Sequence, residues 1–275
     1  MSQLYNSEGS GICLQDVEKL KAIASVSVEY GRTAGACYCL LRIPKFTLEG
    51  KRIRPRVALT SADGKVDGTK VSALAFARRE KPVVTVNAGL FNTSTMIPQG
   101  QTVIDGVSVT NSPMTDDMGT AISDHECYPL CIDGEGNLSA PYGRSVDTAQ
   151  MIADGVRYGV TGWGKFVDQF AKVGTDVFQE IVHPDPYIRQ CIGQYDNGDY
   201  LICTVDKARL GIAANDGGMT YDTLAELLVG KGVKFAYSLD GGGSCETVIG
   251  QRQINPIYEG SSGRAVPTVI CFDAV

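Results

Sequence analysis

The sequence predicts a single α+β domain, with a largely antiparallel or mixed sheet at its core and a few packed helices. First, β-hairpin signals recur, and the strongest is the Asp105-Gly106 pair between alternating apolar residues. Second, only four windows have helical spacing, and they do not alternate with strands as βαβ units would. Third, the 275 residues contain no low-complexity linker and no internal repeat, so one domain is expected.

The first ninety residues are expected to contain two helices and three strands. Residues 14–24 repeat apolar side chains at helical spacing, with acidic residues near the positive end of the helix. The short apolar runs at 36–43 and 56–61 are typical of buried strands. Residues 70–82 return to helical spacing, which a proline ends. The β-branched run "VVTV" then predicts a strand that breaks at residues 87–89.

Hairpins dominate the rest of the chain. The acidic turns at 133–137 and 196–199 lack the spacing of a calcium-binding loop. We therefore interpret their acidic residues as ones that stabilise a turn. Helices are expected at 147–156 and at 220–232, the second with a threonine as N-cap and glycines at its end. The run "RAVPTVICF" predicts a last strand, which Pro267 places at a sheet edge or a bulge.

Composition limits the partners. The net charge is 25 − 31 = −6 and no Lys/Arg run stands out, which excludes nucleic acid as an expected partner. No apolar stretch approaches the roughly 20 residues that span a bilayer, so no membrane partner is expected. The N-terminus lacks the pattern of a secretory signal, which predicts a cytoplasmic protein, with a phage-encoded or virion-associated one as the alternative.

Nine cysteines lie mostly in apolar runs. Their number is odd, so we expect buried, reduced thiols rather than a disulfide framework. The only ligand-like cluster is "HECYPLC", with His125, Cys127 and Cys131, and it lacks the second half of a zinc site. We therefore expect no metal and no cofactor.

The stretch "YSLDGGGSC", residues 237–245, leads from a predicted strand into three consecutive glycines. It fits neither a Walker loop nor a dinucleotide fingerprint, and the chain has no G-x-S-x-G elbow. The chain has two histidines, which gives little support to a Ser-His-Asp catalytic triad. What remains is an acid at a strand end, followed by main-chain amides that glycines leave open to an anion.

Six motifs together make the chain resemble the phosphodiester glycosidase family. They are "VTVNAGLFN" (84–92), "IPQGQTVIDG" (97–106), "YIRQCIGQ" (187–194), "GGMTYDTLAELL" (217–228), "YSLDGGGSCETV" (237–248) and "GRAVPTVICF" (263–272). The resemblance covers residues 70–275 and implies a phosphodiester glycosidase-like core there. No motif aligns in residues 1–69, which we expect to add a helix and strands to the same fold.

The resemblance implies a hydrolase that cleaves the glycosidic bond of a sugar 1-phosphodiester, similar to an N-acetylglucosamine 1-phosphodiester. The positions that match the family's site are Asn87, Asn92, Gly100, Arg189, Arg264, Asp240, Gly241, Gly242, Gly243 and Ser244. The chain departs from the family's pattern at two places: Leu90 stands where a larger aromatic is usual, and Gln190 where a threonine is usual.

Each of these residues has a chemical reason to be there and a structural alternative. An arginine fork can bind phosphate oxygens, so Arg189 and Arg264 would hold the diester, unless they are surface ion-pair partners. Asn87 would bind sugar hydroxyls or cap the turn at Gly89. Asp240 would stabilise or attack the anomeric centre, or organise the glycine turn.

A second carboxylate is expected to activate water, and Asp206 and Glu246 are the candidates. No general acid is required, because a phosphomonoester is already a competent leaving anion. Two competing hypotheses remain. One is a non-catalytic carbohydrate- or phosphosugar-binding module, such as a phage virion component. The other is a cytosolic enzyme that acts on a nucleotide sugar or a signalling diester.

Overall fold

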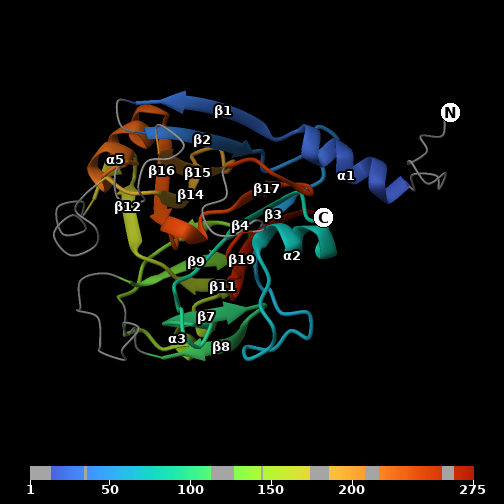
Figure 1. The fold of residues 1–275 in the computed structure, drawn as a ribbon, viewed down its shortest axis with the longest axis vertical. Helices are drawn as coiled ribbons and strands as arrows, with labels where there is room; N and C mark the ends of the chain where they lie inside the picture. The colour runs from blue at the N-terminus through green and yellow to red at the C-terminus, as the bar shows by residue number, and fades with distance from the viewer. Residues whose placement is uncertain are drawn as a thin grey trace.

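The computed structural model describes residues 14–33, 36–112, 127–143, 145–173, 186–207, 217–255 and 263–275. Within them the strands form three main sheets and one short ribbon, and every paired strand is antiparallel. Figure 1 shows the seven-stranded sheet above and the two five-stranded sheets below and beside it. The α+β fold with an antiparallel core is therefore confirmed.

The strands are given in their order across each sheet. The seven-stranded sheet contains β1 (Ser27–Arg32), β2 (Ala36–Ile43), β15 (Tyr200–Lys207), β14 (Arg189–Tyr195), β16 (Val233–Ser238), β12 (Gly164–Asp168) and β13 (Ala171–Lys172). One five-stranded sheet contains β10 (Leu138–Ser139), β9 (Pro129–Asp133), β11 (Val156–Thr161), β7 (Gln101–Ile104) and β8 (Val107–Asn111). The other contains β18 (Arg252–Gln253), β17 (Thr247–Ile249), β4 (Val84–Asn87), β19 (Thr268–Ala274) and β3 (Ile53–Leu59). The ribbon pairs β5 (Phe91–Asn92) with β6 (Ile97–Pro98).

One hydrophobic core joins the three sheets. It contains Leu41 and Tyr237 of the seven-stranded sheet, Ile132 of the first five-stranded sheet, and Val86 and Ile270 of the second. All five side chains are buried. Because the sheets share this core, the described residues form one body rather than separate units. The segment before residue 70 takes part in it, since β2 pairs with β15 and β3 with β19.

The helices form where the sequence predicted them, with shifted ends. They are α1 (Leu14–Ala24), α2 (Ala73–Glu80), α3 (Thr148–Ala153) and α5 (Tyr221–Gly230). The Thr220 side chain caps α5 as expected, and the helix packs Leu224 and Leu228 against the seven-stranded sheet. The helix predicted over 70–82 is shorter, because the Ser72 side chain accepts a hydrogen bond from the amide N–H of Ala75 and starts α2 there.

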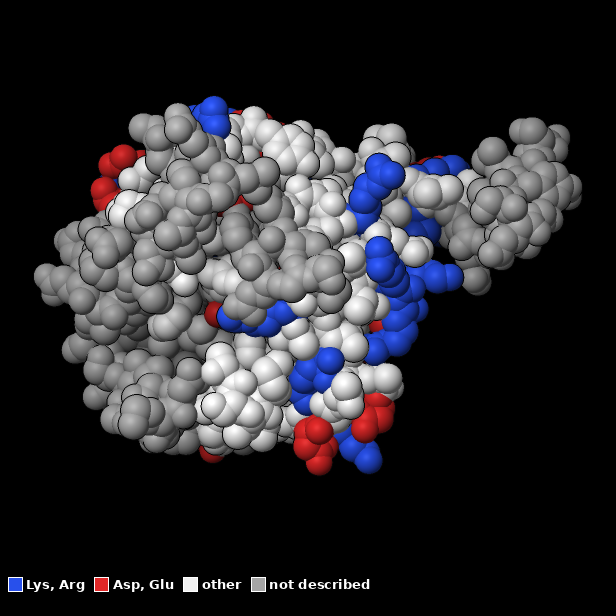
Figure 2. Space-filling view, in the orientation of Figure 1, with Lys and Arg blue, Asp and Glu red and all other residues white. Residues whose placement is uncertain are grey.

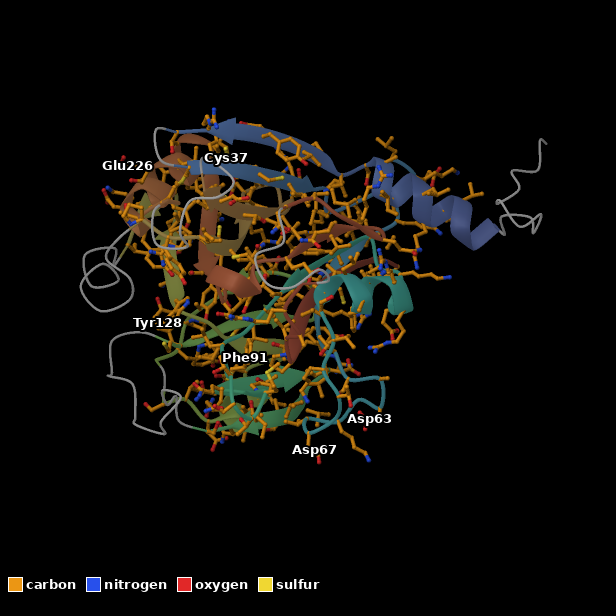
Figure 3. The ribbon with its side chains drawn as sticks, viewed as in Figure 1. Cys37, Asp63, Asp67, Phe91, Tyr128 and Glu226 are labelled. Atoms are coloured by element: carbon orange, nitrogen blue, oxygen red, sulfur yellow. The ribbon has the colours of Figure 1, made fainter. Side chains whose placement is uncertain are left out.

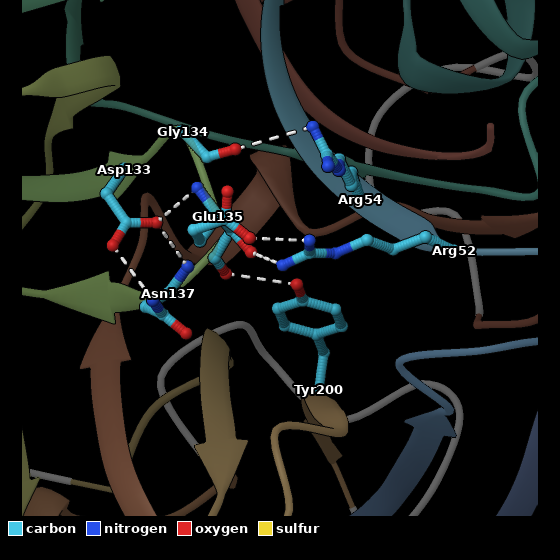
Figure 4. Close-up of polar contacts among 8 residues, drawn as sticks. Arg52, Arg54, Asp133, Gly134, Glu135, Asn137 and Tyr200 are labelled. Carbon is cyan, nitrogen blue, oxygen red and sulfur yellow. Dashed lines mark hydrogen bonds and ion pairs between the residues drawn. The ribbon is translucent and has the colours of Figure 1, made fainter.

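The predicted turns are confirmed where side chains fix the backbone. Asp105 and Gly106 both have positive φ, 54° and 74°, as a tight hairpin turn requires. In the next turn the Asp133 carboxylate accepts hydrogen bonds from the main-chain N–H groups of Glu135 and Asn137, and Arg52 pairs with Glu135 (Figure 4). The acidic residue therefore organises a turn.

The placement of Pro267 differs from the prediction. The strand that follows it, β19, lies between β4 and β3 and not at a sheet edge. Pro267 immediately precedes the strand, where a missing N–H costs no ladder bond, and its carbonyl still accepts from Thr60 N at 3.0 Å.

The eight cysteines among the described residues are free thiols, and seven of them are buried. Cys13 and the candidate zinc ligand His125 lie outside the described residues. In the described part of the chain, no group of three or more His, Cys, Asp or Glu side chains is arranged to hold a metal. None of the described helices has the length and apolarity needed to cross a membrane.

Basic side chains are distributed unevenly on the face shown in Figure 2, where they gather over α1 and α2. Arg78 and Arg79 in the last turn of α2 belong to this group. Positive charge at the C-terminal end of a helix complements the helix dipole, so these arginines stabilise the end of α2.

Candidate active site

The stretch Asp240–Ser244, which we call the glycine loop, carries the chain from one sheet to another. It follows β16 in the seven-stranded sheet, contains the single turn η1 (Gly242–Ser244) and leads to β17 in a five-stranded sheet. Figure 1 shows η1 as the short helical turn between β16 and β4. Side chains from two sheets can therefore reach this loop.

Two of the three glycines are required by the protein's own backbone. A Cβ on Gly241 would lie 2.9 Å from the carbonyl oxygen of Ile188. Gly242 has φ +59°, its N–H donates to the same carbonyl at 3.1 Å, and a Cβ there would lie 2.9 Å from the Tyr187 hydroxyl. The loop thus packs directly on the entry to β14. Gly243 is half-exposed.

We expect Gly242→Ala to lower the free energy of unfolding by about 1–2 kcal/mol, because an alanine in the left-handed region is strained. Urea unfolding of the variant and the parent protein measures the difference. Gly143→Ala is the matched control, since a Cβ at Gly143 meets nothing within 4 Å and should change stability by less than about 0.5 kcal/mol. Equal unfolding midpoints for Gly242→Ala and the parent protein would show that the loop relaxes freely.

Asn87 holds both ends of the glycine loop. It is fully buried at the end of β4, where its Nδ2 donates to the carbonyl of Asp240 at 2.7 Å. Its Oδ1 accepts from the N–H of Glu246 at 3.1 Å. Both halves of the amide are therefore engaged by main-chain atoms, one at the first residue of the loop and one two residues after its end, which is the geometry of a positioning residue.

Asp240 is the first residue of the glycine loop and is half-buried. Its Oδ1 accepts from the N–H of Gly241 at 2.9 Å, and its own N–H donates to the carbonyl of Ala88 at 3.0 Å. The carboxylate orientation is thus fixed by the first glycine while part of the group stays accessible. A fixed carboxylate needs little reorganisation to stabilise a nearby positive centre.

Arg189 is a rigid, buried cation at the start of β14. The residue is 2% exposed, and its Nε donates to the carbonyl of Met219 at 3.2 Å. Its guanidinium carbon lies 3.9 Å from the ring centroid of Tyr221, whose hydroxyl bonds Ser238 at 2.7 Å. The stacked ring fixes the plane of the guanidinium, as bidentate recognition of an oxyanion requires.

Three charged side chains act on the buried thiol of Cys245. Its pKa is raised well above the ordinary value, first by burial and then by the negative charges of Asp240 and Asp206, while Arg189 opposes the shift. The three charged groups come from the glycine loop, β15 and β14. Arg189 pairs with Val205, the neighbour of Asp206, and a Cβ on Gly241 would lie 4.0 Å from the Cα of Arg189.

Arg264 approaches the other end of the loop. Its Nη1 donates to the buried Ser244 hydroxyl oxygen at 3.1 Å. Arg264 itself is half-buried. The two predicted arginines therefore lie at opposite ends of the same loop, Arg189 against its start and Arg264 against its last residue.

Glu246 is turned toward helix α2. The residue is 3% exposed, its Oε2 accepts from the N–H of Ala73 at 2.7 Å, and a Cβ on Gly263 would lie 2.9 Å from its Oε1. Among the described residues, Oε1 has no hydrogen-bond partner. Burial raises the pKa of this carboxyl to about 7, although the N–H groups at the start of α2 lower it. These contacts direct the Glu246 carboxyl group toward α2 and Gly263.

Asn92 and Gly100 lie in the turns that follow β4. The Asn92 Oδ1 accepts from the N–H groups of Ser94 and Thr95, so it organises the turn between β5 and β6. Gly100 has φ +68°, and a Cβ there would clash with the Thr161 side chain. Both residues therefore have local structural roles.

Sequence reasoning missed the partners that fix the site. Tyr221 and Tyr187 stand in two of the family motifs, but no role was predicted for either. Tyr221 packs against Arg189, and Tyr187 lies against Gly242. Gln190 forms a buried network in which its Nε2 donates to Thr247 at 3.1 Å and its Oε1 accepts from Thr204 at 3.1 Å. This network connects β14 and β15 of the seven-stranded sheet to β17 of a five-stranded sheet. The glutamine that replaces the family's usual threonine at position 190 therefore contributes to the contact between the two sheets.

Comparisons with known proteins come from sequence and from structure. A family model described as phosphodiester glycosidase matches residues 80–273. The uncharacterized SPbeta prophage-derived protein YomE of Bacillus subtilis (strain 168) is 25% identical over 257 residues, which are 88% of this chain and 37% of that protein. The chain therefore spans little more than a third of this relative's length.

Two solved structures share the fold. The catalytic domain of zebrafish N-acetylglucosamine-1-phosphodiester alpha-N-acetylglucosaminidase, auto-inhibited by its pro-peptide, has a TM-score of 0.68 at 18% identity, over 91% of this chain and 82% of that chain. A hypothetical protein from Synechocystis has a TM-score of 0.62 at 14% identity, over 92% of this chain and 62% of that chain.

Proposed function

The chain belongs to the phosphodiester glycosidase family, and we propose that it hydrolyses the bond between the anomeric carbon and the phosphate oxygen of a sugar 1-phosphodiester. The products are a free sugar and a phosphomonoester. The observation that carries the proposal is that the glycine loop places Asp240 beside the rigid Arg189: a Cβ on Gly241 would lie 4.0 Å from the Cα of Arg189, which pairs with Val205, the neighbour of Asp206. A diester needs a fixed cation for its phosphate, and its anomeric carbon needs a carboxylate.

Each residue has a role in this proposal. Arg189, with Arg264 at the other end of the loop, binds the phosphate oxygens and stabilises the charge that the leaving phosphomonoester keeps. Asp240 stabilises the oxocarbenium-like centre or attacks the anomeric carbon. Asp206 is the better candidate to take the proton from water, because Glu246 contacts α2 instead. Asn87 holds the loop that presents Asp240.

The test incubates the purified protein in ¹⁸O-labelled water with an N-acetylglucosamine-phosphate-mannose diester and, separately, with UDP-N-acetylglucosamine. We expect free sugar in an amount equal to the mannose phosphate released from the diester, or to the UDP released from the nucleotide sugar, with the label on the anomeric carbon of the sugar. Mass spectrometry of both products locates the label. Label in the phosphate would instead show cleavage of a phosphorus–oxygen bond, and the glycosidase proposal would fail.

A binding module without turnover is the second candidate, because a relative derived from a prophage is consistent with a virion component. The same preparation separates the two hypotheses. Saturable binding of the diester by calorimetry, with no product after long incubation, would favour the binding module. Turnover of UDP-N-acetylglucosamine alone would favour an enzyme that acts on nucleotide sugars.

A further inference from the structure

A polar cleft of about 430 Å³ lies away from the glycine loop. Its walls are β10 with the residues that follow it, the β14–β15 turn, the outer end of β12 and the start of β16. The charged lining residues are Lys45, Lys165, Lys234, Asp168 and Asp196, and the uncharged Ser139 and Gln169 also line the space. We call this space the distal cleft.

The distal cleft lies at the opposite end of the central strands from the candidate active site. β16 begins at the cleft, near Lys234, and ends at Ser238, two residues before Asp240. At about 3.3 Å per residue, the strand separates Lys234 from Asp240 by about 20 Å. The antiparallel neighbour β14 runs the other way, from Arg189 at the loop to Tyr195 in the cleft. The cleft is thus a separate site.

The charges of the distal cleft leave one cation without an acidic partner in the described part of the chain. Lys165 pairs with Asp168 at 2.7 Å, and Lys234 pairs with Asp196 at 2.9 Å. No carboxylate among the described residues forms an ion pair with the ammonium group of Lys45. Three lysines and two aspartates therefore give the cleft one net positive charge.

Lys45 is held in place by its main chain and its stem. Its N–H donates to Asp199 at 3.0 Å, and the other oxygen of that carboxylate pairs with Arg42 at 2.8 Å. A Cβ on Gly198 would lie 2.8 Å from the Cδ of Lys45, so the glycine makes room for the lysine stem. The Asp199 carboxylate is therefore already bonded to Arg42 and to the main chain of Lys45, and the Lys45 ammonium group remains available to an anion in the cleft.

The hairpin turn at the rim of the cleft contains two residues that disfavour its backbone conformation. Gln169 and Phe170 connect β12 to β13, and both have positive φ, 49° and 65°. Such a two-residue turn favours Asn-Gly or Asp-Gly, and this chain uses Asp105-Gly106 in the equivalent place of another hairpin. Gln169 lines the cleft, and Phe170 is 43% exposed beside it. A strained turn that presents these side chains indicates a functional reason for them.

We propose that the distal cleft binds a saccharide that carries one negative charge, a sugar phosphodiester or a uronic acid. Lys45 binds the anion. Gln169 and the exposed Ser139 hydrogen-bond the hydroxyl groups, and the Phe170 ring packs against the apolar face of the sugar ring. This site is independent of the reaction proposed above.

The test measures binding to the full chain by calorimetry and by amide chemical shifts. The probes are glucuronate, glucose 6-(methyl phosphate) and neutral glucose, and none of them has an anomeric phosphate to cleave. We expect at least one anionic probe to bind more tightly than glucose, with shifts at Gln169 and Lys234. No binding of either anion up to about 10 mM, or shifts confined to the glycine loop, would overturn the proposal.

Lys45→Ala should weaken binding of the anionic probe about 10-fold and leave glucose binding unchanged. The control is Lys65→Ala, an exposed lysine on the turn that carries Asp63 and Asp67 (Figure 3). It should bind like the parent protein. If both variants bind alike, Lys45 has no role in binding and the proposal is wrong.

The double change Gln169→Asn with Phe170→Gly separates stability from binding. Because Asn-Gly suits the turn, the variant should unfold at a higher temperature than the parent protein. It should nevertheless bind both the anionic and the neutral sugars about 10-fold more weakly. Unchanged sugar binding in this variant would show that the rim side chains do not contact a ligand.

Discussion

Asp240→Asn is expected to lower kcat and kcat/KM together by about 100-fold or more, the usual size of a preorganised electrostatic effect. The asparagine keeps the shape of the side chain, and its amide oxygen can still accept from the N–H of Gly241. What it removes is the negative charge that faces the developing cation. A parallel fall in both constants means that the lost interaction belongs to the transition state.

The control for this variant is Asp63→Asn, because the Asp63 carboxylate also accepts a main-chain N–H, that of Lys65 at 3.2 Å, in an exposed turn (Figure 3). It should retain the parent rate. Circular dichroism and the unfolding midpoint establish that Asp240→Asn is folded before its kinetics are compared. A folded and fully active Asp240→Asn protein would leave Asp240 as an organiser of the glycine loop only, and the mechanism would be wrong.

Glu246→Gln is expected to change how stability depends on pH. A solvent-exposed glutamate has a pKa of 4.5, whereas burial raises the pKa of Glu246 in the folded protein to about 7. Between these values the folded state holds a proton that the unfolded state has released, so the parent protein loses stability as pH rises. A difference of this size corresponds to about 3 kcal/mol over that window, and stability is level above it. Glutamine does not titrate and should not show this loss.

Urea unfolding at pH 4.5, 6 and 8 measures the difference between Glu246→Gln and the parent protein. The variant should gain relative stability as pH rises through the window. Glu135→Gln is the control, because the Arg52 guanidinium lowers the pKa of Glu135. Its contribution to stability is lost only as pH falls below the unfolded pKa, so its stability difference from the parent protein should be level between pH 6 and 8. A stability difference for Glu246→Gln that stays constant from pH 4.5 to 8 would contradict the raised pKa.

The sequence by itself determined the local structure of this protein. Turn residues with few allowed backbone conformations marked the hairpins at Asp105 and Asp133, and Thr220 marked the start of α5. The same local signals located the glycine loop and the family motifs, because a glycine or a cap reports on the backbone within a few residues. The fold class follows from counting these signals.

Only the tertiary structure decided which partners those residues have. Asn87 meets the carbonyl of Asp240 across 153 positions of sequence, and the glycines are fixed by the carbonyl of Ile188 rather than by a ligand alone. Pro267 precedes a central strand, and Glu246 turns to α2, because strand order and sheet packing place them there. Such contacts depend on which distant strands pair, and that is set by burial of the shared core, which no short stretch of sequence encodes.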